Sequence, residues 1–255
     1  GKSALENQNA GADAYNVAVG YQAGKAVTTG TENTLIGGSA GDALTTGARN
    51  VVLGYGALGN EDGHGRNIAI GYNALNVQNA GADAYNVAVG YGVGASISTG
   101  INNTIIGAFA GDALTTGADN VAMGYAALST EDAHGKNVAI GNYALQDQDA
   151  GADAYNVAVG YNAGKEITTG TLNTLIGGQA GDALTTGTAN VALGYGALSA
   201  EDDHGHNIAI GYHSLVSQNA GTNAYNIAIG SSTGASISTG AQNVIIGGLA
   251  GDALT

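Results

Sequence analysis

Residues 16 to 21 read Asn16-Val17-Ala18-Val19-Gly20-Tyr21, and close copies of this pattern recur along the chain. The opening Asn returns after 17, 17, 17 and then 19 residues, and this cycle of 70 residues repeats. A fixed period of this kind is typical of proteins in which similar units stack on their neighbours. The sequence therefore predicts an all-β fold, a parallel β-solenoid with coils of 17 or 19 residues.

The predicted domain organisation is one continuous β-solenoid array over residues 1–255. A partial coil at 1–10 precedes 70-residue sets at 11–80, 81–150 and 151–220 and a partial set at 221–255. Each set has four coils, which we number one to four; in the first set they open at Asn16, Asn33, Asn50 and Asn67. Because both chain ends fall inside a repeat, we expect a fragment of a longer fibre whose end caps lie elsewhere.

The composition excludes several classes of protein. The chain has 45 Gly, no Pro, no Cys and no Trp, and only 10% of its residues are charged. Aliphatic residues recur in register, so the low complexity does not indicate disorder. The net charge of −14, with 6 basic residues and no basic cluster, disfavours nucleic acid as a partner. Apolar runs are a few residues long, so we expect no membrane insertion by this segment.

Each copy predicts a short strand with two different faces. The fourth place of the pattern is large and never polar, so we expect it to fill the interior, with Val19, Ile36, Leu53, Ile70, Val89 and Ile106 as its first members. The third place is mostly Ala, which lets backbones approach closely. We therefore expect a face shared by three chains, formed by Ala18, Leu35, Ala69, Ala88, Ile105 and Ala139.

The second half of each coil differs between coils. A further aliphatic residue lies seven places past the turn Gly in coils one and two, as in Val27, and four places past it in coils three and four, as in Leu58. Residues 28–30, Thr-Thr-Gly, predict a short second strand and its turn. Residues 61–64 of coil three and 78–81 of coil four are expected to be surface loops.

The stacked Asn residues predict an amide ladder inside the coil or at its corner, in which each side chain bonds the next coil. Its first members are Asn16, Asn33, Asn50, Asn67, Asn86, Asn103, Asn120 and Asn137.

Two surface features are candidate binding sites. Tyr21, Tyr55 and Tyr72 follow turn glycines, and we interpret them as a packed ladder, with a sugar-stacking platform as the alternative. Glu61, Asp62 and His64 are candidate ligands for a divalent cation, which three chains could share. A hard-cation site needs six or more oxygen ligands, so a solvated turn is favoured here and no metal or cofactor is predicted.

The repeat resembles the head repeat of the trimeric autotransporter adhesins, the YadA-like head. Its signature, Ser/Asn-Val-Ala-Ile-Gly with a small residue after two more positions, matches residues 16–23 and 67–74. Similar arrays are found in phage tail-fibre proteins. The resemblance implies a left-handed parallel β-roll, three chains side by side, and an adhesive or receptor-binding fibre. The coils of 17 and 19 residues are longer than usual for the family, so binding specificity in the loops is not carried over.

We therefore expect a structural and adhesive fibre segment, extracellular on a virion or a bacterial cell surface, that binds a glycan or protein receptor. No nucleophile is paired with a base at a fixed place outside the repeat, so we expect no enzyme. The alternatives are an ice-binding solenoid and a purely structural extracellular filament. The ice-binding alternative requires a flat Thr array on every coil, whereas Thr-Thr or Ser-Thr pairs occur only in coils one and two.

Overall fold

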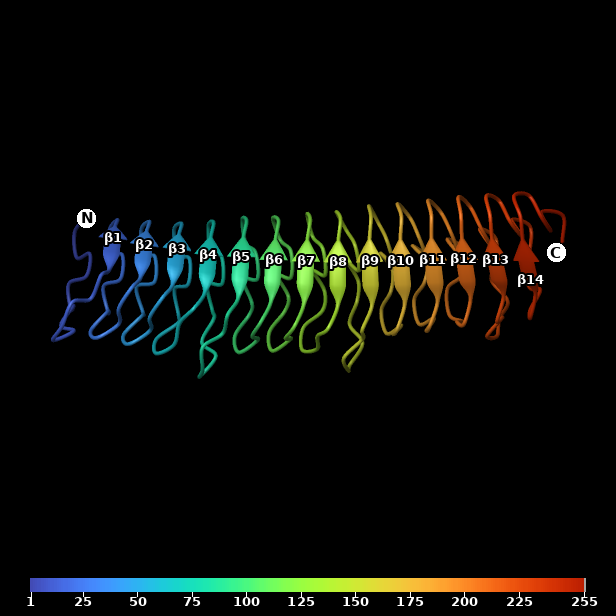
Figure 1. Cartoon of the computed structure of the whole chain (residues 1–255). Coiled ribbons are helices and arrows are strands. Elements are labelled where there is room, and N and C mark those ends of the chain that lie inside the picture. Colours follow the sequence, from blue (N-terminus) through green and yellow to red (C-terminus); the bar gives the residue numbers. More distant parts are fainter. Residues whose placement is uncertain (255) are drawn as a thin grey trace. The chain divides into compact units, whose positions relative to one another are not determined.

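The computed structural model describes residues 1–254, and their regular structure consists only of short parallel strands (Figure 1). The described residues contain no helix, and hence none long and apolar enough to cross a membrane. The chain divides into two compact units, residues 1–123 and residues 124–255.

Every strand has three residues. The first unit contains β1 (Val17–Val19), β2 (Thr34–Ile36), β3 (Val51–Leu53), β4 (Ile68–Ile70), β5 (Val87–Val89), β6 (Thr104–Ile106) and β7 (Val121–Met123). The second unit contains β8 (Val138–Ile140), β9 (Val157–Val159), β10 (Thr174–Ile176), β11 (Val191–Leu193), β12 (Ile208–Ile210), β13 (Ile227–Ile229) and β14 (Val244–Ile246).

Within each unit the strands pair in parallel, each with the strand of the next coil. Val17 faces Thr34 and Ala18 faces Leu35, so equivalent places of successive coils stack directly. The same register continues across a 19-residue step, where Ile68 pairs with Val87. The two extra residues of coil four are therefore absorbed outside the strand. The predicted parallel β-solenoid with one strand of the repeat per coil is confirmed.

The turn glycines end the strands because their backbones stack in close contact. Gly20 has a φ of +146°, and a Cβ added to it would lie 2.2 Å from the carbonyl oxygen of Gly37. Gly37, with a φ of +137°, is in the same situation with respect to Gly54. Any side chain would collide with the backbone of the next coil, so this column requires glycine.

The two faces of the strand are the reverse of those predicted. The third-place residue is the buried one, whereas the fourth-place residue points outward with its second-place neighbour. The expected shared face is therefore interior: Leu35, Ala69, Ala88, Ile105 and Ala139 are fully buried, and Ala18 in the first coil is half-buried. The expected interior is outward: Val19 and Leu53 are exposed, and Ile36, Ile70, Val89 and Ile106 are half-buried.

The physical reason is that other side chains fill the narrow interior. Leu75 of coil four is fully buried, and so is the small Ala69 in the strand of the same coil. Coil two has the opposite arrangement, with the large Leu35 in the strand and Gly41 at the place equivalent to Leu75. A Cβ on Gly41 would lie 3.0 Å from Leu35 Cδ2 and 2.8 Å from Leu44 Cδ1. The small strand residue therefore makes room for an inward side chain rather than for a neighbouring chain.

The predicted second strand is not formed. Residues 28 and 29 form a bend, although the segment still bonds to the next coil. The Thr28 amide donates to the Thr45 carbonyl at 2.9 Å, and the Thr28 hydroxyl donates to the same oxygen at 3.2 Å. The hydroxyl therefore bonds the next coil, which leaves it less available for the array that ice binding would require.

Candidate functional site

The Asn column forms a ladder of hydrogen bonds inside the coils. Asn33 is 1% exposed, and its Nδ2 donates to the Gly47 carbonyl of its own coil at 2.8 Å. Its Oδ1 accepts the backbone amide of Asn50 in the next coil at 2.9 Å. One side chain therefore closes a coil and joins it to the next. Asn67 and Asn207 in coil four keep the Oδ1 bond, to the amides of Asn86 and Asn226, but their Nδ2 is buried without a partner within residues 1–254. Because the bonds of this column join successive coils, its role is structural rather than ligand-binding.

A second buried polar column was missed by the sequence analysis, which expected surface loops at these places. Glu61 and Gln78 are both fully buried, as are their copies Glu131, Glu201, Gln148 and Gln218. The signal was present in the spacing. Glu61 and Gln78 lie seven residues past Gly54 and Gly71, which is where Val27 and Leu44 lie in coils one and two. The interior column therefore alternates between apolar and polar pairs.

Gln78 is well accommodated in this column. Its Oε1 accepts Nδ2 of Asn86 at 2.7 Å, and its Nε2 donates to the Ser98 carbonyl at 3.3 Å. The amide thus takes part in the Asn ladder and bonds the following coil. Its pairing offsets the cost of burying a polar side chain.

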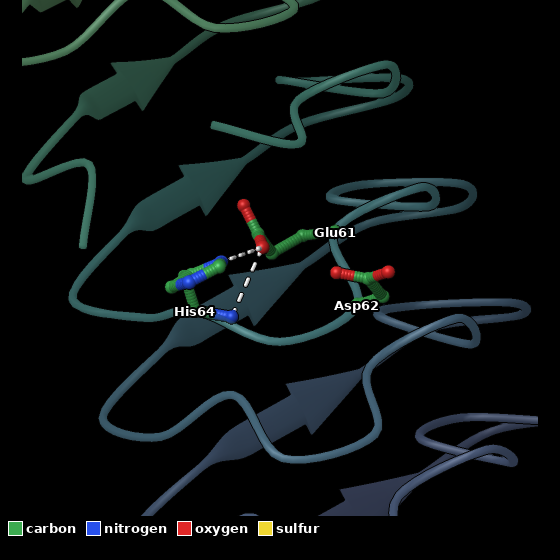
Figure 2. Close-up of side chains that lie close together, drawn as sticks. All are labelled: Glu61, Asp62 and His64. Atoms are coloured by element: carbon green, nitrogen blue, oxygen red, sulfur yellow. Dashed lines mark hydrogen bonds and ion pairs between the residues drawn. The ribbon is translucent and has the colours of Figure 1, made fainter. Parts of the chain in front are cut away.

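Glu61 is less well paired. Its Oε1 accepts the backbone amide of His64 at 3.1 Å and lies 3.7 Å from His64 Nδ1, as Figure 2 shows. Its Oε2 is buried and has no hydrogen-bond partner within residues 1–254. Burial raises the pKa of the Glu61 carboxyl, and the hydrogen bond from the His64 amide lowers it to a smaller extent. Glu131 and Glu201 have their pKa raised by burial in the same way.

The candidate metal ligands are gathered but differ in exposure. One potential ligand atom from each of Glu61, Asp62 and His64 lies within 4.8 Å of the others, and both other sets repeat the cluster. Figure 2 shows Glu61 and His64 turned toward each other, with no bond drawn to Asp62. Glu61 is buried, so the predicted solvated turn is wrong for this residue. Asp62 is exposed, as a solvated turn requires. Two carboxylates and one imidazole are fewer ligands than a calcium site requires.

Aromatic rings form rows along the surface. Tyr55 and Tyr72 stack with ring centroids 5.8 Å apart, and Tyr72 and Tyr91 with centroids 5.2 Å apart. In the second unit, Tyr195 and Tyr212 stack at 5.9 Å. These rings remain about half exposed, and so does Tyr21. The packed ladder and the accessible platform, considered as alternatives from the sequence, are therefore compatible with each other.

The outward strand face is the other prominent surface. Its second and fourth places form parallel columns of Val, Ile, Leu, Met and Thr, which alternate with the buried third place. Leu53 and Leu193 on this face are 45% and 43% exposed. Within each unit the columns make a contiguous apolar surface, which is unusual on a monomer and indicates an interaction surface. We call it the outward apolar face.

Comparison of the chain with protein-family models, with curated proteins and with solved structures finds no match. The functional conclusion therefore depends on the repeat and on the surfaces described above.

Proposed function

We propose that this chain is a structural and adhesive segment of an extracellular attachment fibre, on a virion or on a bacterial cell surface. The observation that supports the proposal best is the outward apolar face. Stacked coils present Val, Ile, Leu or Met on this face again and again, although Thr, which holds the second place in coil two, would suffice for a strand. The likeness of the repeat to the heads of trimeric adhesins and to phage tail fibres supports the same function.

The proposed partner of this face is the same chain, in a homotrimer. Lateral packing of three outward apolar faces would remove their aliphatic side chains from water, at about 25 cal/mol per Å² buried. The buried third-place face is not available for this contact, so the corrected assignment moves the proposed interface to the opposite side of the strand. The remaining surfaces, including the tyrosine rows, would face outward toward a receptor.

Assembly can be tested by light scattering. We expect a mass of three times the 24.8 kDa of one chain. Replacing Leu53 and Leu193 by Glu should dissociate the trimer, because like charges would meet within an apolar contact. The control is Leu172→Glu, which changes a 59% exposed Leu outside the strand face and should leave the trimer intact. A wild-type mass of one chain, or a trimer that tolerates the first pair of substitutions, would contradict the proposed assembly.

Attachment requires a separate measurement. Beads coated with the protein should be retained on bacterial or animal cells under flow, whereas beads coated with albumin should be washed away. Retention on none of the cell types tested would contradict an adhesive role and favour the purely structural filament.

A further inference from the structure

Three hollows interrupt the surface along the tyrosine rows. One, of about 260 Å³, is lined by Tyr72, Tyr91, Phe109 and Asp112, and we call it the Tyr91 hollow. A second, of about 450 Å³, is lined by Tyr195, Tyr212, His213 and Asp182, and is called the Tyr212 hollow. A third, of about 320 Å³, is lined by Tyr143, Gln146, Tyr161, Asn162 and Lys165, and is called the Tyr161 hollow. Each hollow lies within a single unit.

Glycine opens the two hollows that contain Asp. Gly92 lines the Tyr91 hollow with a φ of +60°, and an added Cβ would lie 3.3 Å from the Phe109 ring. Gly196 lines the Tyr212 hollow, also with a φ of +60°, and its Cβ would lie 2.6 Å from His213 Cδ2. Both glycines thus allow an aromatic ring of the next coil to lie close against the turn. A larger residue would displace that ring and fill the hollow.

Each of the three hollows contains a buried hydrogen-bond acceptor without a partner. Asp112 Oδ1 and Asp182 Oδ1 are inaccessible and accept no hydrogen bond from residues 1–254. The same holds for Gln146 Oε1 and Asn162 Oδ1 in the Tyr161 hollow. Burial also raises the pKa of both Asp carboxyls. A buried acceptor without a donor is costly in a folded protein, so a turn of these side chains toward the hollow, where a ligand could donate a hydrogen bond, would be favourable.

The aromatic walls specify the rest of the ligand. Tyr72 and Tyr91 stack with their planes within 9° of parallel and Tyr195 and Tyr212 within 15°, whereas Tyr143 and Tyr161 meet edge to face at 81°. Tyr91, Tyr161 and Tyr212 are 55%, 57% and 54% exposed, so part of each ring can contact a ligand. The face of an aromatic ring carries partial negative charge and attracts the weakly positive C–H groups of a flat ligand. The ligand should therefore combine a C–H face with hydroxyl donors at its edge, which is the chemistry of a sugar ring.

The charge of the surroundings selects among sugars. The chain has a net charge of −14, and Asp112 and Asp182 add carboxylates within the hollows themselves. Acidic sugars would be repelled. A cationic ligand fits the Tyr161 hollow less well because Lys165 lines it. A ligand common to the three hollows is therefore uncharged.

We infer that the Tyr91, Tyr161 and Tyr212 hollows are subsites for an uncharged carbohydrate, which contacts the exposed parts of the tyrosine rings and donates hydroxyl hydrogen bonds to the Asp, Gln and Asn side chains that line the hollows. This inference deepens the attachment function proposed above, and rests on it, by assigning the receptor to the class of neutral glycans.

The test is calorimetric titration of the intact chain with cellotetraose, mannotetraose and chitotetraose. Trigalacturonate serves as the acidic probe and tetralysine as the cationic one. The triple variant Tyr91→Ala, Tyr161→Ala and Tyr212→Ala removes one wall of every hollow. Its matched control is Tyr15→Ala, Tyr85→Ala and Tyr155→Ala, which removes three exposed tyrosines that line none of the hollows. Circular dichroism of each variant verifies the fold.

We expect at least one neutral tetrasaccharide to bind, the hollow variant to bind it at least tenfold more weakly, and the control variant to stay within twofold of the wild type. Asp112→Ala with Asp182→Ala should also weaken binding several-fold. Binding of none of the neutral probes, binding of only the acidic or cationic probe, or equal binding by the two triple variants would overturn the inference.

The same variants separate this inference from the proposed attachment function. If beads coated with the wild type are retained on cells but no neutral probe binds, the fibre function stands and the sugar subsites are wrong. If a neutral probe binds through the hollows but the beads are not retained, the subsites stand and the attachment function is wrong.

Discussion

Two adjacent residues of β10 provide a direct test of which strand face is interior. Leu175 is fully buried, whereas Ile176 lies on the outward apolar face and is 37% exposed. Substitution by Ala removes three carbon atoms from either residue, so the two variants lose the same amount of side chain. Any difference in the free energy of unfolding must then come from the surroundings of the two side chains.

The expected difference follows from the packing of each residue. Transfer of three buried carbon atoms contributes about 2.4 kcal/mol at ~0.8 kcal/mol each. Leu175 also lies next to Gly164 and Gly181, whose added Cβ atoms would lie 2.7 Å and 2.9 Å from its methyl groups. Neither glycine has a side chain that could fill the space, so Leu175→Ala should cost about 3–5 kcal/mol in total. Water can replace the lost atoms of Ile176, so Ile176→Ala should cost only about 1.5 kcal/mol.

Amide hydrogen exchange is the suitable assay, because stacked coils do not unfold in a single step. It reports the local free energy of opening for β9, β10 and β11 separately. Ile176→Ala also changes the proposed interface between chains. Light scattering must therefore show that both variants have the same mass as the wild type before their amide exchange is compared. If Ile176→Ala lowers protection as much as Leu175→Ala, the interior has been assigned to the wrong face.

Two further predictions concern the buried polar columns. Because burial raises the pKa of Glu61, Glu131 and Glu201 in the folded state, the folded chain binds these protons more tightly than the unfolded chain. Their contribution to stability should therefore be full below the unfolded pKa and fall as pH rises through the folded one. Replacing all three by Gln should raise the urea midpoint at pH 8 and change it little at pH 4; an equal change at both would contradict this ionisation. In the Asn ladder, Asn33→Ala leaves a carbonyl and an amide unpaired and should cost about 1–3 kcal/mol for each, against under ~0.5 kcal/mol for Asn79→Ala, which changes an exposed Asn; equal midpoints would argue against the ladder.

The period of the sequence was sufficient to predict the stacking of the coils. Equivalent residues come back at fixed intervals, and parallel pairing places them directly above one another, as Val17 and Thr34 show. The turn glycines and the Asn column could be predicted for the same reason, because each residue contacts the equivalent residue of the next coil. A repeated sequence therefore reveals the residues that interact with their own equivalents.

The sidedness of the strand could not be predicted in the same way. A three-residue strand such as Val17–Val19 contains no polar residue to mark the solvent side. Only the strands of coil two carry such a residue, the outward Thr34, Thr104 and Thr174, and Thr is common at either face of a strand. A clearer signal comes from comparing two places, the third place of the strand and the place four residues past the turn Gly. Coil two has a large and then a small residue there, Leu35 and Gly41, whereas coil four has a small and then a large one, Ala69 and Leu75. Large and small residues alternate between the two places because they share one interior volume. This covariation would have assigned the third place to the interior.

The hollows were also beyond the reach of the sequence pattern, because they depend on residues that differ between coils. Gly92 lies beside Phe109 of the next coil, and Gly196 beside His213, whereas most coils lack this combination of glycine and ring. The Asn and Gly columns hold the backbone in place without help from these positions. The places after the turn glycine are therefore free to vary without disturbing the stacking of the coils.

This division between invariant and variable columns has a consequence for binding. A single shallow hollow with one acceptor and a few aromatic rings offers little contact area, so its affinity for a sugar should be weak. The described residues of one chain carry at least these three hollows, and a homotrimer would repeat each of them three times. When the receptor is itself a repeating glycan on a surface, each binding event after the first becomes intramolecular and occurs at a high effective concentration. A fibre built from near-identical coils can therefore hold a glycan-coated surface firmly although each of its subsites binds a free sugar weakly.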